Sequence, residues 1–424
     1  TVTVWLNRAG NEWNDPVVIR GTPGVTDLDS VRLVDVKGRG IDGLLYSGDA
    51  RDGADETYLL EFIDGAKPYL MTETRNNMGS ATRLEYATST EYYLADEAAG
   101  DPWETTLPSP RWVVASVTVE DGIAGSQRHT TFDYHHGYWD GAEREFRGFG
   151  RVDRRDAGSF AEYEAGAADP DSWQSADRER FSPPKLTRTW FHLGPVGPEH
   201  GDWRELTFED EYWAPDPRLV ERPDATEALL AALDRRVARD AVRTLRGKKL
   251  REEVYAEDGS DRADRPYEVT EYAYGLRQEL APGEVIDAPG NGPRPRGVVF
   301  PHRVATRETS WERGTDPKTQ LSFQRDYDDY GQHRLSMSIA CPRGWEPGTE
   351  TGEYLATVER RRFADPVEGD RPVDAVAQHA EYEVVDDGAR TVAEFRAAVE
   401  ADEVALDVVD LTRRYYDGAA YDGR

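Results

Sequence analysis

Residues 134–152 read YHHGYWDGAEREFRGFGRV, and this stretch does most to decide the fold. Its four glycines exclude a helix, because each glycine inside a helix costs about 1 kcal/mol relative to alanine. Aromatic and charged residues between the glycines predict strands joined by a turn. The histidine pair and the nearby glutamates leave two interpretations open, an active site or a structural ion-pair cluster.

Short alternating runs between Gly, Asp and Pro turns predict that most of the chain is β-structure. These runs occupy residues 1–6, 57–63, 113–119, 130–134, 188–192, 267–274, 320–327 and 335–340. Tyrosine and threonine are common in them, as expected for half-buried strands. We therefore expect a mainly β fold.

Two segments have helical spacing of apolar residues. Residues 226–245 follow Pro223 and Asp224, begin with Thr226 as the expected N-cap, and end before Gly247. Residues 391–401 predict a second, shorter helix. We expect surface loops at 158–180 and 281–296, and domain boundaries near residues 65 and 220.

The 424-residue chain carries a net charge of -30, and arginine supplies most of its basic charge because lysine is scarce. Such a surface is typical of proteins that work in high salt, where screening relieves self-repulsion. The composition favours a halophilic source over an ordinary acidic, arginine-rich protein. It argues against a nucleic-acid partner, which would need a concentrated basic face.

The single cysteine, Cys341, excludes an intrachain disulfide and a cysteine-rich metal site. We expect Cys341 to be a buried structural side chain. No apolar run is long enough for a transmembrane helix, and no signal segment is visible. The chain starts without methionine in a strand-like run, so we interpret it as a piece of a longer protein.

His135 and His136 are adjacent, so regular strand geometry would point them to opposite faces and away from a shared metal. Glu143 and Glu145 are spaced like a strand-face pair and could in principle perform glycosidic acid–base chemistry. Arginines at 144 and 147, however, offer them ion-pair partners. We therefore predict no catalytic, cofactor-binding or metal-binding residues here.

Residues 34–45, VDVKGRGIDGLL, resemble the calcium loop of repeat propeller blades. Calcium needs six to eight oxygen ligands, yet Lys37 and Arg39 occupy two ligand positions and Gly43 replaces the last aspartate. We predict a loop that kept its turn and lost its metal. Nucleophile-elbow, phosphate-loop and dinucleotide motifs are also absent from the sequence.

Several segments in order resemble the middle region of the B component of Tc insecticidal toxin complexes, which is shared with SpvB-type virulence proteins. The segments are KPYLMTETRNNMGSATRLE (67–85), STEYYLAD with GDPW (within 86–103), the stretch at 134–152, LTRTWFHLG (186–194), LRGKKLREEVYAEDG (245–259) and YYDG (415–418). The resemblance covers nearly the whole chain.

The resemblance implies three regions. Residues 1–65 would be the end of a degenerate β-propeller of FG-GAP/VCBS-like type. Residues 66–220 and 221–424 would be the N-like and C-like parts of a TcdB middle region. There the chain would form an extended, coiled β-sheet shell of Rhs/YD type with one or two surface helices. Residues 325–331 and 414–418 look like YD-type turns.

The resemblance also implies a function. We expect a secreted or extracellular, non-catalytic scaffold that helps to enclose or present a toxic C-terminal cargo. Its partners would be an A-like translocator, a C-like Rhs component or a toxin domain of the same chain, with no nucleic acid and no membrane insertion. One alternative is a secreted adhesin or carbohydrate-binding β-protein. A weaker alternative is a glycosidase that uses Glu143 or Glu145.

Overall fold

The computed structural model describes residues 1–25, 29–48, 57–65, 67–123, 126–156, 183–198, 201–280, 297–345, 354–364, 374–385, 388 and 390–415. The predicted loops at 158–180 and 281–296 lie outside the described residues. Most of the predicted turn at 414–418 does too.

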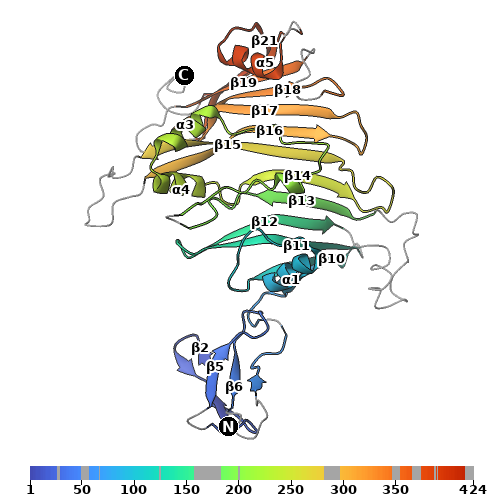
Figure 1. The fold of residues 1–424 in the computed structure, drawn as a ribbon. Coiled ribbons are helices and arrows are strands. Elements are labelled where there is room, and N and C mark those ends of the chain that lie inside the picture. The colour runs from blue at the N-terminus through green and yellow to red at the C-terminus, as the bar shows by residue number, and fades with distance from the viewer. Residues whose placement is uncertain are drawn as a thin grey trace.

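Three small antiparallel units form the N-terminal region, at the bottom of Figure 1. They pair β1 (Val2–Val4) with β4 (Val17–Ile19), β2 (Asn7–Arg8) with β3 (Glu12–Trp13), and β5 (Ser30–Val34) with β6 (Gly43–Ser47) and β7 (Thr57–Leu60). The indole Nε1 of Trp112 donates to the Arg39 carbonyl at 2.6 Å, which ties this region to the main sheet.

A 14-stranded antiparallel sheet contains all the other described strands, and they follow one another in sequence order. They are β8 (Glu73–Arg75), β9 (Ser80–Thr88), β10 (Trp112–Asp121), β11 (Ser126–Asp140), β12 (Glu145–Asp156), β13 (Lys185–Phe191), β14 (Lys249–Ala256), β15 (Glu268–Leu280), β16 (Val298–Ser310), β17 (Lys318–Tyr327), β18 (His333–Ala340), β19 (Leu355–Phe363), β20 (Val376–Val384) and β21 (Leu406–Arg413). The prediction of a mainly β protein is confirmed, and each predicted strand run overlaps an observed strand.

The 134–152 stretch forms the end of β11, a short turn and the start of β12. The two strands pair antiparallel, and the register shifts between Tyr138 and Trp139. The predicted interpretation of this stretch as strands joined by a turn is confirmed. Residues 325–331 likewise end β17 and turn into β18, where Asp328 Oδ1 accepts the amide hydrogens of Tyr330 at 2.9 Å and Gln332 at 3.0 Å.

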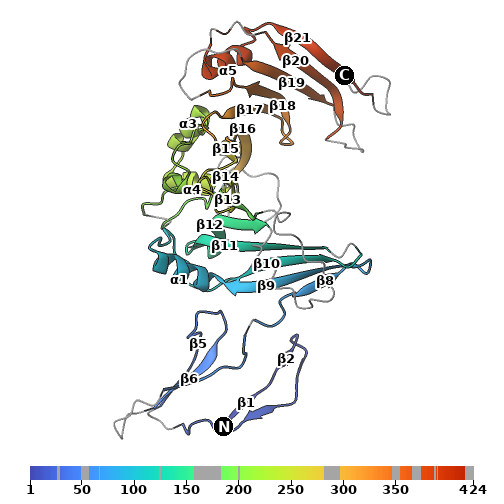
Figure 2. The ribbon, with the colours of Figure 1, turned by 90° about the vertical axis from the view of Figure 1, so that its right-hand side faces the viewer.

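The sheet continues without a break from β13 to β14, on either side of the predicted boundary near residue 220. The described residues between these strands, 192–198 and 201–248, leave the sheet and lie over one of its faces (Figure 2). The three-region division stays a prediction.

Helices α1 (Ser89–Ala99), α3 (Asp224–Ala232), α4 (Arg235–Arg243) and α5 (Val392–Glu400) lie along the same side of the sheet (Figure 2). The short 3₁₀ helix η2 (Glu209–Glu211) belongs to the segment that crosses the sheet. The described residues thus contain more helices than the one or two that we expected.

Sequence reasoning missed α1, although its signal is present. Thr88 and Glu91 form a capping box at its start, the reciprocal arrangement that satisfies two otherwise unpaired amide hydrogens. Tyr92 and Tyr93 on α1 pack their rings against Tyr134 and Trp103. These aromatic residues of the 86–103 segment therefore serve tertiary packing.

The single helix predicted at 226–245 is wrong, because α3 and α4 are separated by extended backbone at Leu233 and Asp234. Thr226 is not an N-cap: it lies within α3, and its hydroxyl accepts the Leu276 amide hydrogen at 3.1 Å. Leu233 and the apolar residues of both helices pack on Leu276 of the sheet. Tertiary packing thus overrides the helical periodicity.

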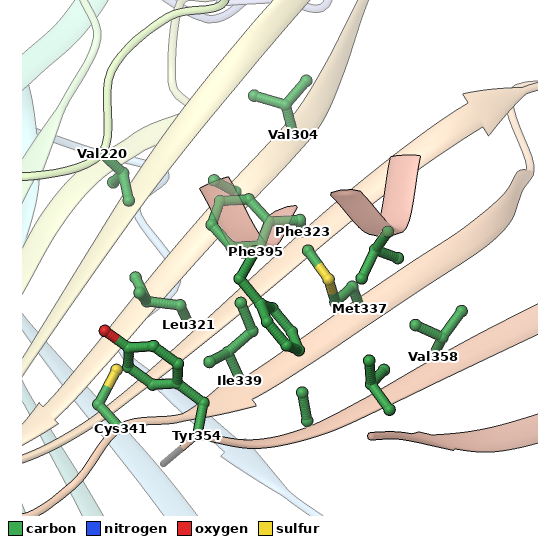
Figure 3. Close-up of a cluster of buried hydrophobic side chains, with 14 of the residues drawn as sticks. Val220, Val304, Leu321, Phe323, Met337, Ile339, Cys341, Tyr354, Val358 and Phe395 are labelled. Atoms are coloured by element: carbon green, nitrogen blue, oxygen red, sulfur yellow. The ribbon is translucent and has the colours of Figure 1, made fainter. Parts of the chain in front are cut away.

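The second predicted helix is confirmed as α5, which begins after Thr391 with a capping box to Glu394. Phe395 and Val399 of α5 enter the largest apolar cluster, which also contains Phe323, Met337 and Ile339 (Figure 3). Cys341 is buried in this cluster, as predicted. Among the described residues, no helix is both long and apolar enough to cross a membrane.

Candidate functional site in the buried ionic networks

One cross-strand row runs through the covered face of the sheet, and we call it the buried row. Each member pairs in register with the next, in the order His135, Arg151, Trp190, Arg251, Glu271, Arg307, Leu321, Ile339 and Ala356. Apart from Trp190 on β13, the residues of the row from β11 to β16 are ionisable, and those from β17 onward are apolar. Its charged residues make ion pairs and hydrogen bonds on this face.

Arg251 and Arg307 form ion pairs with the carboxylates of Asp216, Glu253 and Glu271, and all five side chains are 0% to 3% exposed. Arg307 donates from Nη2 to Asp216 Oδ1 at 2.5 Å and from Nε to Glu271 Oε2 at 3.0 Å. Arg251 donates from Nε to Glu253 Oε1 at 2.7 Å. Burial lowers the pKa of Arg251, but the neighbouring carboxylates outweigh this effect and raise it.

The carboxylates of Glu253 and Glu271 also accept hydrogen bonds from backbone amides of residues 204–220, a segment that we call the strap. Trp213 donates its amide hydrogen to Glu253 at 3.0 Å, and Leu219 donates to Glu271 at 3.0 Å. Asp216, itself in the strap, accepts the indole N–H of Trp311 at 2.6 Å. Because buried amides need partners, the two strand glutamates replace the hydrogen bonds that the irregular strap cannot make with itself.

His135 and His136 contact different carboxylates. His135 Nδ1 lies 2.6 Å from Asp96 of α1, and His136 Nε2 lies 2.7 Å from Glu211 of η2. His136 has φ of 55°, so regular strand alternation does not describe the pair, although the two rings do not converge. The Glu104 amide donates to His136 Nδ1 at 3.2 Å, which places the ring hydrogen on Nε2, facing Glu211.

Glu211 connects this histidine to the buried row. Arg151 donates to it at 2.6 Å and the indole N–H of Trp190 at 2.9 Å. Burial alone would raise the pKa of Glu211, but the His136 hydrogen bond and the charge of Arg151 outweigh burial and hold this pKa at about 2. Glu211 is therefore a carboxylate at neutral pH and anchors the strap to β11, β12 and β13.

Glu143 lies in the turn between β11 and β12 and Glu145 at the start of β12, and both face α4. Arg243 of α4 contacts Glu143 at 3.3 Å and Glu145 at 3.0 Å, and Arg246 also contacts Glu145. Asp140 at the end of β11 binds Arg147 and Arg239, each at 2.6 Å. The prediction that these glutamates pair with arginines is confirmed, but the partners only partly match the expected ones. Arg147 lies 3.4 Å from Glu145, Arg144 forms no ion pair among the described residues, and the other partners come from α4 and from Arg246.

Charged groups of the loop at 34–45 pair with its own backbone and with Glu61, which follows β7. Asp35 accepts the amide hydrogens of Arg39 at 2.9 Å and Gly40 at 2.5 Å. Lys37 lies 2.7 Å from Glu61, which Arg39 also contacts. In the described residues no group of three or more His, Cys, Asp or Glu side chains could hold a metal ion.

A nucleophilic role for Cys341 has no support from its surroundings. Burial raises the pKa of its thiol to about 12, and the thiolate is the reactive species. The charged residues of the buried row are each engaged with a partner on another element. The arrangement is suited to holding the strap on the sheet.

Sequence reasoning missed the networks at Asp216, Glu253 and Glu271. Their signal was the charged residues at alternate positions of one strand face, as in Arg251 and Glu253, which share a face of β14 with Tyr255. Such positions face the same side as buried apolar neighbours, so a charge there needs a buried partner. The partners come from other strands and from the strap, which no local pattern identifies.

Comparison with known proteins agrees with this architecture. Residues 8–174 match the family described as insecticide toxin TcdB middle/N-terminal region, and residues 240–386 match insecticide toxin TcdB middle/C-terminal region. A search of curated proteins gives no match.

Two solved structures share the fold. A crystal structure of TcdB2–TccC3 without its hypervariable C-terminal region has a TM-score of 0.72 and 23% identity, over 98% of this chain and 20% of that one. A Photorhabdus luminescens Tc holotoxin pore has a TM-score of 0.70 and 23% identity, over the same shares of the two chains. This chain thus spans about a fifth of those chains, and it belongs to the middle region of the TcdB-type insecticidal toxins.

Proposed function

We propose that this chain is a non-catalytic scaffold segment of a Tc-type toxin, in which its sheet forms part of a shell around a toxic cargo. The observation that carries the proposal is the difference between the two faces of the sheet. One face is sealed by helices and strap, and the other carries polar rows. A wall between a compact exterior and an enclosed polypeptide needs two such faces.

The polar rows cross several strands in register. One consists of Thr306, Ser322, Ser338 and Thr357 on β16 to β19. Another consists of Thr189, Glu252, Thr270, Glu308 and Gln320 on β13 to β17. Small hydroxyl and acidic side chains offer little apolar surface to a guest chain, so this face would not bind it tightly.

The absence of catalysis in this segment is part of the proposal. Glu143 and Glu145 are neutralised by arginines of α4 and adjoining residues. A glycosidic acid and base need free access to a sugar between them, and ion-paired carboxylates in a turn are poorly suited to that task.

The partners follow by similarity. One of the matched structures contains TcdB2 with TccC3, and another is a Tc holotoxin pore. For this chain we propose a C-like component that completes the shell and an A-like translocator. We further propose that residues 1–65 end a propeller, and that the toxin is secreted.

The adhesin alternative has one supporting observation. Among the described tryptophans, Trp5 and Trp13 are the exposed ones, at 52% and 65%. Exposed indoles can stack on sugars, but buried ones such as Trp190 cannot. A glycan array probed with wild type and with Trp5→Ala and Trp13→Ala variants would reveal binding that depends on these residues, which the scaffold proposal does not expect.

Protease protection tests the scaffold proposal. The full-length protein that contains this chain is co-expressed with a C-like component, and cleavage of the cargo by a nonspecific protease is followed over time. We expect the assembled cargo to resist proteolysis that degrades the isolated cargo within minutes. Equal cleavage rates would contradict a shell.

A double Glu143→Gln and Glu145→Gln variant separates the scaffold from a glycosidase. We expect assembly or stability to decline, with no glycoside hydrolysis in either wild type or variant. Hydrolysis by wild type that disappears in the variant would overturn the scaffold proposal.

A further inference from the structure

A second buried cluster, around Asp140, has more cationic than anionic groups at its centre. Arg147 of β12 and Arg239 of α4 each donate from Nη2 to the same oxygen of Asp140, at 2.6 Å. The three side chains are 0% to 1% exposed. Asp140 Oδ1 is occupied as well, because it accepts the amide hydrogens of Ala142 at 3.0 Å and Glu143 at 3.2 Å.

The two guanidinium groups retain donors that Asp140 does not satisfy. Among the described residues, Arg147 Nη1 and Arg239 Nε and Nη1 are buried and have no hydrogen-bond partner. Arg147 Nε lies 3.4 Å from Glu145. A buried donor without an acceptor costs about 1–3 kcal/mol, and more when it is charged. Three such donors on two buried cations call for another acceptor.

The charged side chains at the edge of the cluster do not supply this further acceptor. At the edge of the cluster, Glu143 and Glu145 contact Arg243 and Arg246, so these four groups balance one another. The centre holds one carboxylate and two guanidinium groups. Burial lowers the pKa of Arg147, Asp140 opposes this, and the charges of Arg243 and Arg239 lower it further. The cation at Arg147 is thus incompletely compensated by this chain.

Gly194 leaves one side of Arg147 without a side chain. A Cβ at this position would come within 3.4 Å of Arg147 Nη1 and 3.3 Å of the Arg243 Cα. Gly194 also has φ of 70°, a conformation that other residues adopt only with strain. The chain therefore keeps the smallest residue next to an unpaired guanidinium nitrogen.

We propose that the Asp140 cluster binds a small monovalent inorganic anion of the halide class, held by the unpaired donors of Arg147 and Arg239. The anion brings the centre of the cluster to neutrality and satisfies the guanidinium groups. It thereby strengthens the contact of α4 with the β11–β12 hairpin. The site is independent of the proposed scaffold function.

Anion substitution at constant ionic strength tests the site. The full-length protein is unfolded thermally in mixtures of sodium chloride and sodium gluconate at fixed total concentration. We expect the unfolding midpoint to rise with chloride along a saturating curve. The Arg239→Gln variant should lose this dependence or need at least tenfold more chloride. Arg243→Gln, which leaves the central three groups intact, should keep it.

Crystals soaked in sodium bromide provide a measurement that does not depend on a variant that folds. We expect an anomalous bromide peak within hydrogen-bond distance of Arg147 Nη1 or an unpaired nitrogen of Arg239. A site that shows only water, or a midpoint that is identical in chloride and gluconate, would overturn the proposal. A chloride dependence that Arg239→Gln retains in full would overturn it too.

Discussion

The covered face of one sheet is held in two different ways. From β11 to β16, arginines and carboxylates bind the strap, and Arg251 and Glu253 are completely buried there. From β16 to β20, an apolar cluster receives α5 through Phe395 and Val399 (Figure 3). The buried row passes from the first region to the second without a change of face, so position in the sheet does not explain the difference.

The two regions differ because different elements cover them, the strap in one and α5 in the other. The strap is irregular and brings backbone amides that need acceptors, whereas α5 satisfies its own backbone and brings an apolar face. Buried ion pairs contribute little net stability over a well-packed apolar replacement, but losing one partner is costly. We infer that the ionic region specifies where the strap sits and that the apolar region supplies most of the hydrophobic stability.

The largest effect should come from removing one carboxylate of the ionic region. Glu271→Ala leaves Arg307 Nε and the amides of Leu219 and Val220 without their carboxylate acceptor. We expect a loss of about 3–5 kcal/mol in unfolding free energy, measured by urea denaturation. Glu308→Ala, on the exposed face of β16, is the matched control and should change stability by less than about 0.5 kcal/mol. Similar losses of unfolding free energy in both variants would contradict the inference that the ionic region specifies the position of the strap.

The next effect should come from the apolar region. Phe395→Ala removes a fully buried ring of α5 and should cost about 3 kcal/mol. Hydrogen exchange should show lost protection in α5 and β19, with strap amides unchanged. Equal loss of protection in the strap would mean that the two regions unfold as one.

Acid should weaken the strap region more than the α5 region. Burial, aided by Arg222 and Arg218, lowers the pKa of His192 to about 3. Between pH 6.5 and 3 the unfolded chain therefore binds more protons at this residue. Stability is complete above pH 6.5 and falls by up to about 1.4 kcal/mol per unit as the pH drops.

Glu211 adds to this loss only below its ordinary pKa of 4.5, because its lowered pKa makes the contribution complete above that pH. His192→Phe should reduce the slope between pH 6.5 and 5. Denaturation of wild type and variant at a series of pH values measures this change. An unchanged slope in His192→Phe would show that the imidazole does not drive acid sensitivity.

Added salt should distinguish the two regions least, as measured by the thermal unfolding midpoints of variants in each of them. From 0.1 M to 1 M KCl the screening length falls from about 10 Å to about 3 Å, which relieves repulsion in a chain of net charge -30. We expect the thermal midpoint to rise by the same amount in wild type, Glu271→Ala and Phe395→Ala, because buried pairs are screened little. A flat or falling midpoint would remove the inference of a halophilic source.

Much of the fold was predictable from local patterns. The alternation in 113–119 and 335–340 identified β10 and β18, and the glycine-rich 134–152 stretch predicted a strand pair with an ion-pair cluster. The break between α3 and α4 was not predictable, because Leu233 fits the helical spacing and only its contact with the sheet interrupts the helix. The capping box at Thr88 would have revealed α1.

The sequence by itself determined the β-rich class, the family and the pairing of Glu143 and Glu145 with arginines, since period, turn residues and motif order are local properties. Only the tertiary structure decided which arginines these are. Arg239 and Arg243 lie about a hundred residues away in sequence on α4, 99 and 98 positions from their partners Asp140 and Glu145. Sheet register likewise brought Arg251, Glu271 and Arg307 side by side, because cross-strand neighbours are set by pairing between distant segments.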